Sequence, residues 1–135
     1  MSKNKQDIAL FFRALADRTR LRLLNLIADR EVCVCYFVEI LGTNQPKVSR
    51  HLAYLRRAGL VQARREGKWM HYRISQPTDT TAKSLLQGVR AWLEQDDGMK
   101  KDRARLDNIC GAPKLPARLR NAPLPGKPRL IVVAE

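Results

Sequence analysis

Residues 44–74, NQPKVSRHLAYLRRAGLVQARREGKWMHYRI, decide the fold because the spacing of their apolar residues changes from helical to strand-like partway along. The first part predicts a helix over residues 45–57, with Asn44 as the capping residue in front and Gly59 as the stop behind. The predicted buried face of this helix repeats every three or four residues. It consists of Val48, Leu52 and Leu55.

The second part of this stretch predicts a β-hairpin. Residues 60–66 lead into a tight turn at Glu66-Gly67, and residues 68–74 return from it. The returning run alternates with a period of two, with one face made of Met70, Tyr72 and Ile74.

Upstream residues add further helices. Residues 5–15 carry apolar side chains at helical spacing, and so does the run that follows Asp17, a suitable N-cap. Residues 34–41 predict a short helix that stops at Gly42. Two short helices joined by a tight turn and followed by a basic hairpin have the layout of a winged helix-turn-helix. The predicted fold class is therefore mainly α with a β-hairpin wing.

Downstream, residues 79–96 predict a helix with a long apolar stripe: Ala82, Leu85, Leu86, Val89, Trp92 and Leu93. The stripe either covers the core of the chain itself or packs against a second subunit. Residues 98–135 hold five of the seven prolines and predict a basic, partly extended tail, in which the run LIVV at 130–133 resembles a strand. The predicted division is a domain over 1–97 and a tail over 98–135.

The net charge of +13 on 135 residues indicates a polyanionic partner, nucleic acid before an anionic membrane. Residues 43–73 hold eight basic residues and one acidic residue, net +7, whereas 1–42 carry +2, 74–97 carry −2 and 98–135 carry +6. A face that merely keeps a protein soluble usually mixes signs. The near single-signed charge therefore favours DNA binding by the helix and hairpin.

We predict that helix 45–57 enters the major groove, where Gln reads adenine, Arg reads guanine, and Ser and Lys hold phosphate. The wing would contact the neighbouring minor groove or phosphates. The predicted DNA contacts are Gln45, Lys47, Ser49, Arg50 and His51 in the helix, and Arg64, Arg65, Lys68 and His71 in the wing.

Three stretches, ALADRTRLRLLNLI at 14–27, EVCVC at 31–35 and the 44–74 string, resemble the ArsR/SmtB family of arsenical-resistance repressors over roughly residues 8–95. Members are homodimeric winged-helix repressors that leave DNA when a metal or metalloid binds. The resemblance implies repression at double-stranded operator DNA and a homodimer formed through the first and last helices. The implied interface residues are Phe11, Phe12, Leu85, Leu86, Val89, Trp92 and Leu93.

Cys33 and Cys35 fall at or just before the start of helix 34–41, where a helix N-terminus and the nearby Arg30 favour thiolates. Residues two apart in a regular helix point about 200° apart, so chelation by both sulfurs would require the first turn to unwind. A lone C-x-C also describes two small buried hydrophobes. Its resemblance to the As(III)/Sb(III) site of the arsenic-responsive members implies a metalloid inducer instead, As(III) or Sb(III), with no organic cofactor.

The sequence departs from that family pattern after C-V-C. The pattern usually continues with Asp-Leu and often a third cysteine, whereas Tyr36, Phe37 and Val38 follow here. We expect Cys110 to supply the third thiolate, from its own or the partner subunit. The alternative is a two-thiolate site, suited to methylated arsenite. Zinc is disfavoured because helix 79–96 has no His, and His51 and His71 lack metal-ligand spacing to the cysteines.

Other function classes are weaker. The chain has no C-x-x-C, no Gly-rich phosphate loop and no H-E-x-x-H, so we expect no enzyme. It has no apolar run that would span a bilayer and no signal peptide, which predicts a cytoplasmic protein without a membrane partner. The rival is a thiol-redox or sulfur-responsive repressor in which Cys110 pairs with Cys33 or Cys35. An arsenical-binding chaperone without DNA function is disfavoured by the 45–57 helix.

Overall fold

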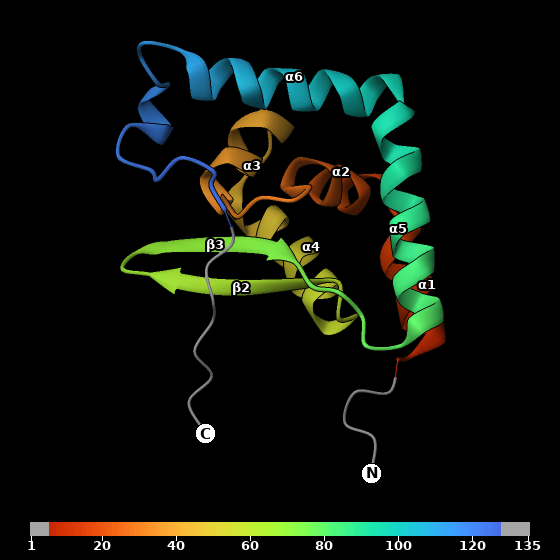
Figure 1. Cartoon of the computed structure of the whole chain (residues 1–135). Coiled ribbons are helices and arrows are strands. Elements are labelled where there is room, and N and C mark those ends of the chain that lie inside the picture. The colour runs from red at the N-terminus through yellow and green to blue at the C-terminus, as the bar shows by residue number, and fades with distance from the viewer. Residues whose placement is uncertain (1–5, 128–135) are drawn as a thin grey trace.

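The computed structural model describes residues 6–127. Helices form most of this part of the chain, and they are joined by loops to a small antiparallel sheet (Figure 1). The helices are α1 (Ile8–Leu15), α2 (Arg18–Ile27), α3 (Val34–Leu41), α4 (Gln45–Arg57), α5 (Thr80–Gln95) and α6 (Asp97–Gly111), followed by the 3₁₀ turn η1 (Ala117–Leu119). The strands are β1 (Val32–Cys33), β2 (Val61–Glu66) and β3 (Trp69–Ile74). No helix within residues 6–127 is long and apolar enough to cross a membrane.

The sheet confirms the predicted wing and adds a strand to it. β2 and β3 form the hairpin, and β1 pairs with the other edge of β3, giving the order β1-β3-β2. Glu66 pairs with Trp69, so the two turn residues are Gly67 and Lys68, one position later than predicted. Gly67 has a φ of 59°, which suits glycine at the first position of a two-residue hairpin turn.

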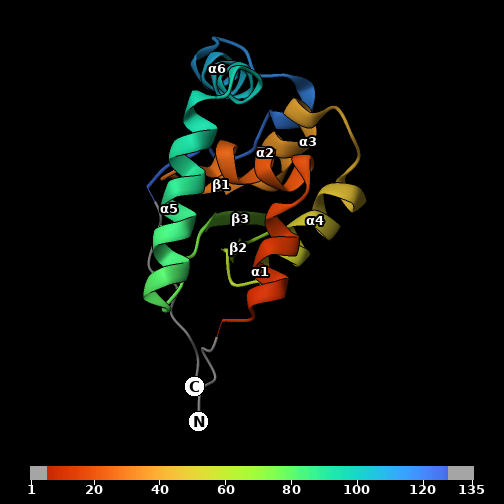
Figure 2. The same cartoon turned by 90° about the vertical axis from the view of Figure 1, so that its right-hand side faces the viewer.

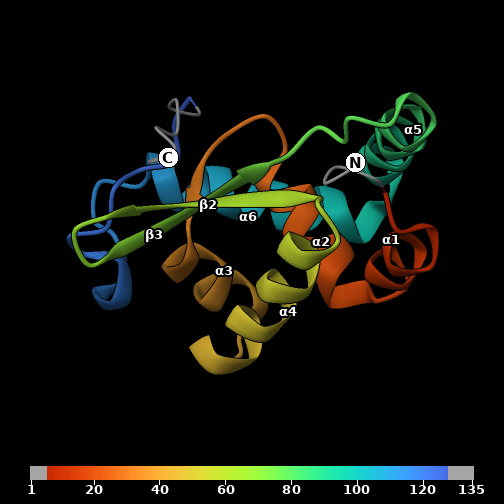
Figure 3. The same ribbon diagram turned by 90° about the horizontal axis from the view of Figure 1, so that it is seen from below.

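Aspartate and asparagine side chains set the helix starts. Asp17 accepts a hydrogen bond from the backbone N–H of Arg20 and Asn44 from that of Lys47, as the sequence predicts. Asp79 and Asp96 begin α5 and α6 in the same way. α4 then spans Gln45–Arg57, as predicted, and it packs beside the hairpin (Figure 3). The fold is therefore a winged helix-turn-helix.

The structure differs from the predicted, partly extended tail over residues 98–111, because these residues belong to α6, which lies across α2 and α3 (Figures 1 and 2). Met99 and Leu106 are buried, and Arg22 holds the carboxylate of Asp102 through two hydrogen bonds of 2.7 and 3.0 Å. The proline content of residues 98–135 suggested an extended chain, but the five prolines of this segment begin only at Pro113, after the helix.

After α6, the chain returns to the start of the sheet. Leu119 of η1 is buried and η1 packs on α3. Further along, the backbone N–H of Glu31 donates to the carbonyl of Gly126 at 2.7 Å, and the N–H of Gly126 donates back at 3.1 Å. This bridge ties the tail to the residue in front of β1. The strand-like run at 130–133 lies outside the described residues.

Candidate thiol site and DNA-reading surface

Cys33 and Cys35 lie side by side where β1 passes into α3. Their Sγ atoms are 3.0 Å apart. Cys33 ends β1 and is the N-cap of α3, with an extended backbone at φ −70° and ψ 142°. Because Cys33 is not in a helical conformation, the 200° argument of the sequence analysis does not apply to this pair. The expectation that α3 must unwind to bring the sulfurs together is wrong.

The pKa values of the two thiols are shifted in opposite directions. The hydrogen bond from Cys35 is the main cause that lowers the pKa of Cys33 to about 7. Burial opposes this shift, and the backbone N–H groups of Cys35, Met70 and Val34 contribute to it. The same hydrogen bond and burial raise the pKa of Cys35. Near neutral pH the pair is therefore poised as one thiolate that accepts a hydrogen bond from one thiol. A soft, thiophilic ligand fits this donor set.

Cys110 lies in the last turn of α6, which packs on α3, and it is half-buried. Burial raises the pKa of its thiol, and the positive charge of Arg30 opposes that rise. Within residues 6–127, no three or more His, Cys, Asp or Glu side chains form a group that could hold a metal ion. The structure thus brings two of the three predicted ligands together. It does not place the third in ligand geometry with them.

Tyr36, the residue after Cys35, is fully buried. Its hydroxyl is the one buried side-chain polar atom without a hydrogen-bond partner in the described part of the chain. Burial, followed by the charges of Cys110, Cys35 and Cys33 in that order, raises the pKa of Tyr36 to about 12. The hydroxyl is therefore within electrostatic reach of all three thiols.

The thiol pair is connected to the wing through the sheet. Cys33 lies opposite His71 and Val32 opposite Tyr72 in the pairing of β1 with β3. On the other side, α3 contacts α4, the helix predicted to read DNA. A conformational change at the thiols would therefore reach the wing through β1 and β3, and α4 through α3.

Two predicted DNA contacts belong to an internal charge cluster instead. The guanidinium of Arg64 holds both carboxylate oxygens of Glu31, which is 4% exposed. The imidazole of His71 is also 4% exposed, and its Nε2 lies 2.9 Å from the carboxylate of Glu66. Arg64 and His71 were predicted from the sign of their charge. Glu31, the partner of Arg64, is 33 residues away in sequence, so the sequence analysis did not reveal this ion pair.

The other predicted DNA contacts are mostly free to reach a ligand. Gln45, Lys47 and Arg50 are exposed on α4, and Arg65 and Lys68 are exposed on the wing. Ser49 is half-buried. His51 is half-buried too, and it faces inward, because its Nδ1 lies 3.4 Å from Arg20 and 3.8 Å from Asp17.

Sequence reasoning missed Arg20 as a residue that fixes α4. Its guanidinium lies 4.1 Å from the ring centre of Tyr54 and also donates to the backbone carbonyl of Ala14. Arg57 lies 5.0 Å from the same ring centre. This contact pattern ties α4 to α2 at the helix that carries Gln45 and Arg50.

The predicted dimer residues fall into two groups. Phe11, Leu86 and Leu93 are buried in the core of the chain itself. Phe12, Leu85 and Trp92 are 51%, 43% and 76% exposed, on helices α1 and α5 at one edge of the molecule (Figures 2 and 3). An apolar hollow of about 430 Å³ lies between these helices, with Phe12, Val89 and Trp92 in its lining.

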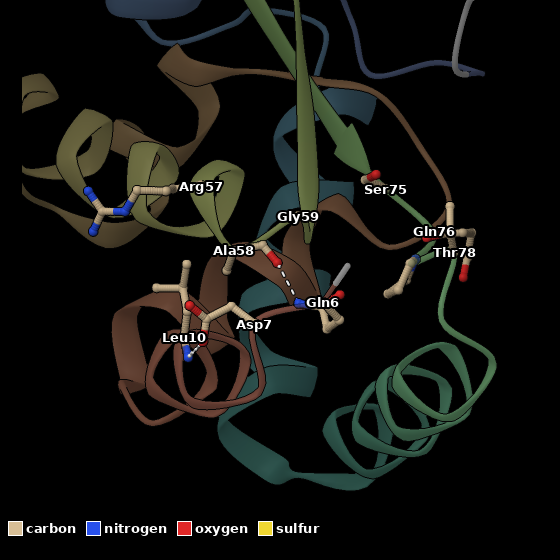
Figure 4. Close-up of a pocket in the computed structure, with 10 residues that line it drawn as sticks. Gln6, Asp7, Leu10, Arg57, Ala58, Gly59, Ser75, Gln76 and Thr78 are labelled. Atoms are coloured by element: carbon tan, nitrogen blue, oxygen red, sulfur yellow. Dashed lines mark hydrogen bonds between the residues drawn. The ribbon is translucent and has the colours of Figure 1, made fainter. Parts of the chain in front are cut away.

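A second hollow, of about 260 Å³, lies between the start of α1, the end of α4 and the loop before α5 (Figure 4). Gln6 donates a hydrogen bond to the carbonyl of Ala58 across it, and the Asp7 carboxylate accepts from the backbone N–H of Leu10 as the α1 cap. The described residues that line it include no His or Cys. Its carboxylate thus has a structural role.

Comparison with known proteins gives a consistent picture. The sequence profile of "Bacterial regulatory protein, arsR family" matches residues 17–63. Over 92 residues the chain is 42% identical to the arsenic resistance transcriptional regulator ArsR1 of Pseudomonas putida, covering 64% of this chain and 72% of that protein. Over 107 residues it is 44% identical to the arsenical resistance operon repressor of Escherichia coli, covering 73% and 92%.

Two solved structures extend the comparison. The homodimeric winged helix-turn-helix domain of Mb0332 from Mycobacterium bovis matches with a TM-score of 0.52 and 35% identity, over 67% of this chain and 84% of that one. The AntR antimony-specific transcriptional repressor matches with a TM-score of 0.51 and 30% identity, over 65% and 78%.

Proposed function

Since the chain belongs to the arsR family of bacterial regulatory proteins and is a winged-helix transcriptional repressor, we propose that it holds operator DNA until trivalent arsenic or antimony binds Cys33 and Cys35. The observation that carries the proposal is the 3.0 Å approach of the two sulfurs at the N-cap of α3. This pair is built into the sheet that bears the wing. Operator DNA lies in the bacterial cytoplasm, so the proposal places the protein there.

Charge and exposure support the DNA side of this proposal. Residues 43–73 carry a net charge of +7 and coincide with α4 and the hairpin. Gln45, Lys47 and Arg50 are exposed on the helix whose width suits a major groove. Arg65 and Lys68 take the wing contacts to phosphates. Arg64 and His71 are excluded from this set because they serve the internal cluster with Glu31 and Glu66.

The chemistry of the thiol pair supports the inducer side. Arsenite in neutral water is As(OH)₃, and each thiol that binds replaces one hydroxide, whose oxygen leaves as water with the thiol proton. Two thiols therefore release two waters, and arsenic keeps its oxidation state. The lowered pKa of Cys33 supplies the first nucleophilic thiolate. The third position on arsenic has two candidates, Cys110 as predicted from the sequence and an oxygen ligand.

The release of DNA would follow from the positions of Cys33 in β1 and Cys35 in the first turn of α3. An arsenic atom bound to both sulfurs would replace their direct 3.0 Å contact, so the two sulfurs must rearrange around it. Cys33 would carry β1 and the opposite residue His71 with it, while Cys35 would carry the start of α3, which packs on α4. The wing and α4 would then lose the relative placement that matches DNA.

The exposed apolar face supports a homodimer. Phe12 and Trp92 are exposed apolar side chains that line one hollow, and Leu85 is exposed on the same helix as Trp92. An exposed apolar patch of this kind indicates an interaction surface. Two copies joined there would present two α4 helices to an inverted repeat. The homodimeric Mb0332 domain is similar in fold.

The test is operator binding by the full chain in the presence of As(III), Sb(III), methylarsenite, Zn(II) and Cd(II) in parallel. The proposal expects release by the trivalent arsenicals and antimony, and loss of that release in Cys33→Ser and in Cys35→Ser. Cys110→Ser tests the third thiolate separately, since unchanged As(III) affinity removes Cys110 as a ligand.

The redox alternative rests on the low pKa of Cys33, which also favours oxidation. In it, Cys110 would form a disulfide with Cys33 or Cys35. Mass spectrometry after peroxide or polysulfide treatment, beside the arsenite titration, separates the two functions. Release by peroxide with no effect of As(III) would replace the metalloid proposal by the redox one.

A further inference from the structure

Tyr36 presents a polar group that no other group of the described chain pairs with. Its side chain is fully buried, yet its hydroxyl has no hydrogen-bond partner. Buried hydroxyls are paired in the great majority of native structures, because an unpaired one forfeits its hydrogen bonds to water. A phenylalanine would fill the same space without this cost. The hydroxyl therefore points to a partner that is present only in another state of the protein.

The position of the hydroxyl indicates what that partner is. Tyr36 follows Cys35 in α3, and the ionisable groups that act on it are the thiols of Cys110, Cys35 and Cys33. Cys33 and Cys35 are already in contact with each other, and the last turn of α6 brings Cys110 to the same helix. The unused donor thus belongs to the same small region as the thiol pair.

The chemistry of arsenite supplies an acceptor in that region. When two thiols bind As(OH)₃, two waters leave, and the product is a bis-thiolate that still carries one As–OH. This oxygen would be buried beside apolar side chains, where it needs a hydrogen bond. A phenol is protonated at neutral pH and can donate one.

Resting on the proposed function, we propose that the Tyr36 hydroxyl donates a hydrogen bond to the hydroxide that remains on arsenic after Cys33 and Cys35 have bound it. Tyr36 is then a specificity-determining residue that takes the place of a third thiolate. The site recognises a metalloid that bears an oxygen ligand. An organic arsenical such as phenylarsine oxide has carbon in the third position after two thiols bind, so it gains nothing from the hydroxyl.

The test compares Tyr36→Phe with the wild-type full chain by isothermal titration calorimetry, using arsenite and phenylarsine oxide as the two probes. The loss of one hydrogen bond predicts arsenite binding weakened about tenfold. Phenylarsine oxide affinity should be unchanged. The melting temperature of the ligand-free variant should equal or exceed that of the wild type, because the substitution removes an unpaired buried hydroxyl.

Cys110→Ser is the matched variant for the third position, and the proposal expects its arsenite affinity to stay unchanged. Three results would overturn the proposal: unchanged arsenite affinity in Tyr36→Phe, equal weakening of both probes in that variant, or weakened arsenite binding confined to Cys110→Ser. A failure of the proposed function looks different, since neither probe would then bind the wild type through Cys33 and Cys35.

Discussion

Cys33 in β1 lies directly opposite His71 in β3, so the first candidate metalloid ligand is a member of the sheet that carries the wing. The imidazole of His71 is held by Glu66, the last residue of β2. The side chain of Arg64 binds Glu31 and joins the wing to the segment in front of β1, whereas His71 is held within the wing itself. The candidate thiol site and the predicted wing contacts therefore share one short sheet.

The exposed Arg65 and the half-buried Arg64 of the wing should behave differently on substitution. Arg64→Ala leaves the buried carboxylate of Glu31 without its two-pronged partner and should lower the free energy of unfolding by about 3 kcal/mol. Arg65→Ala removes an exposed charge and should leave stability within about 0.5 kcal/mol while weakening DNA binding. Urea denaturation of both variants, beside a DNA-binding assay, measures the contrast. Equal destabilisation by both substitutions would refute the assignment of Arg64 to the internal cluster.

The affinity for DNA should fall steeply as the salt concentration rises, and individual basic residues should contribute separately to this dependence. Lys47 is exposed in the first turn of α4, and we predict that it contacts phosphate. Lys47→Ala should lower the slope of log affinity against log salt by about 1, and should do so for any DNA sequence. Arg50→Ala should instead relax the preference for operator over random DNA. Fluorescence anisotropy at several salt concentrations measures both, with Lys83→Ala on the distant α5 as the control. A slope altered equally by Lys83→Ala would show that the effect is only one of net charge.

The thiol pair should titrate near neutrality. Cys33 has its pKa lowered to about 7 chiefly by the hydrogen bond from Cys35, so it is a thiol below that pH and a thiolate above it. The ultraviolet absorbance of the thiolate should rise as pH increases through about 7 in Cys110→Ser. In the double variant that also carries Cys35→Ala, the step should move upward, because alanine has no hydrogen-bond donor to stabilise the Cys33 thiolate. A step that stays in place would mean that Cys35 does not set the pKa of Cys33.

The apolar face on α1 and α5 should control assembly. Trp92→Glu places a charge on a side chain that is 76% exposed in the single chain and that we assign to the interface. We expect sedimentation velocity to show a monomer for Trp92→Glu and a dimer for the wild type. Gln87→Glu adds the same charge to an exposed position of α5 and should remain a dimer. Retention of the dimer by Trp92→Glu would place the interface elsewhere.

Local signals in the sequence were enough to predict α4 and the wing. Asn44 and Gly59 bracket the helix, and the alternation after Gly67 marks a strand, so each element is encoded within a few residues. The resemblance of these residues to arsenical-resistance repressors also identified the family that the comparisons show. The family could therefore be predicted from the sequence alone.

The features that were missed depend on contacts between distant residues. Pairing with β3 holds Cys33 in an extended conformation, and this allows its sulfur to meet that of Cys35. Likewise, Arg64 forms an ion pair with Glu31, although its sequence context does not distinguish it from the other basic residues of the wing. The absence of a hydrogen-bond partner for the Tyr36 hydroxyl depends on how the chain packs around it, so it cannot be predicted from a sequence pattern.

The most direct test of the account is an arsenite titration of the protein bound to an operator duplex selected from random DNA by the metalloid-free chain. The wild type should release the duplex as arsenite is added. Cys35→Ser should bind the same duplex with equal affinity but require about 100-fold more arsenite, because chelation by two linked sulfurs is lost. Release of the duplex from Cys35→Ser at the wild-type arsenite concentration would contradict the central claim.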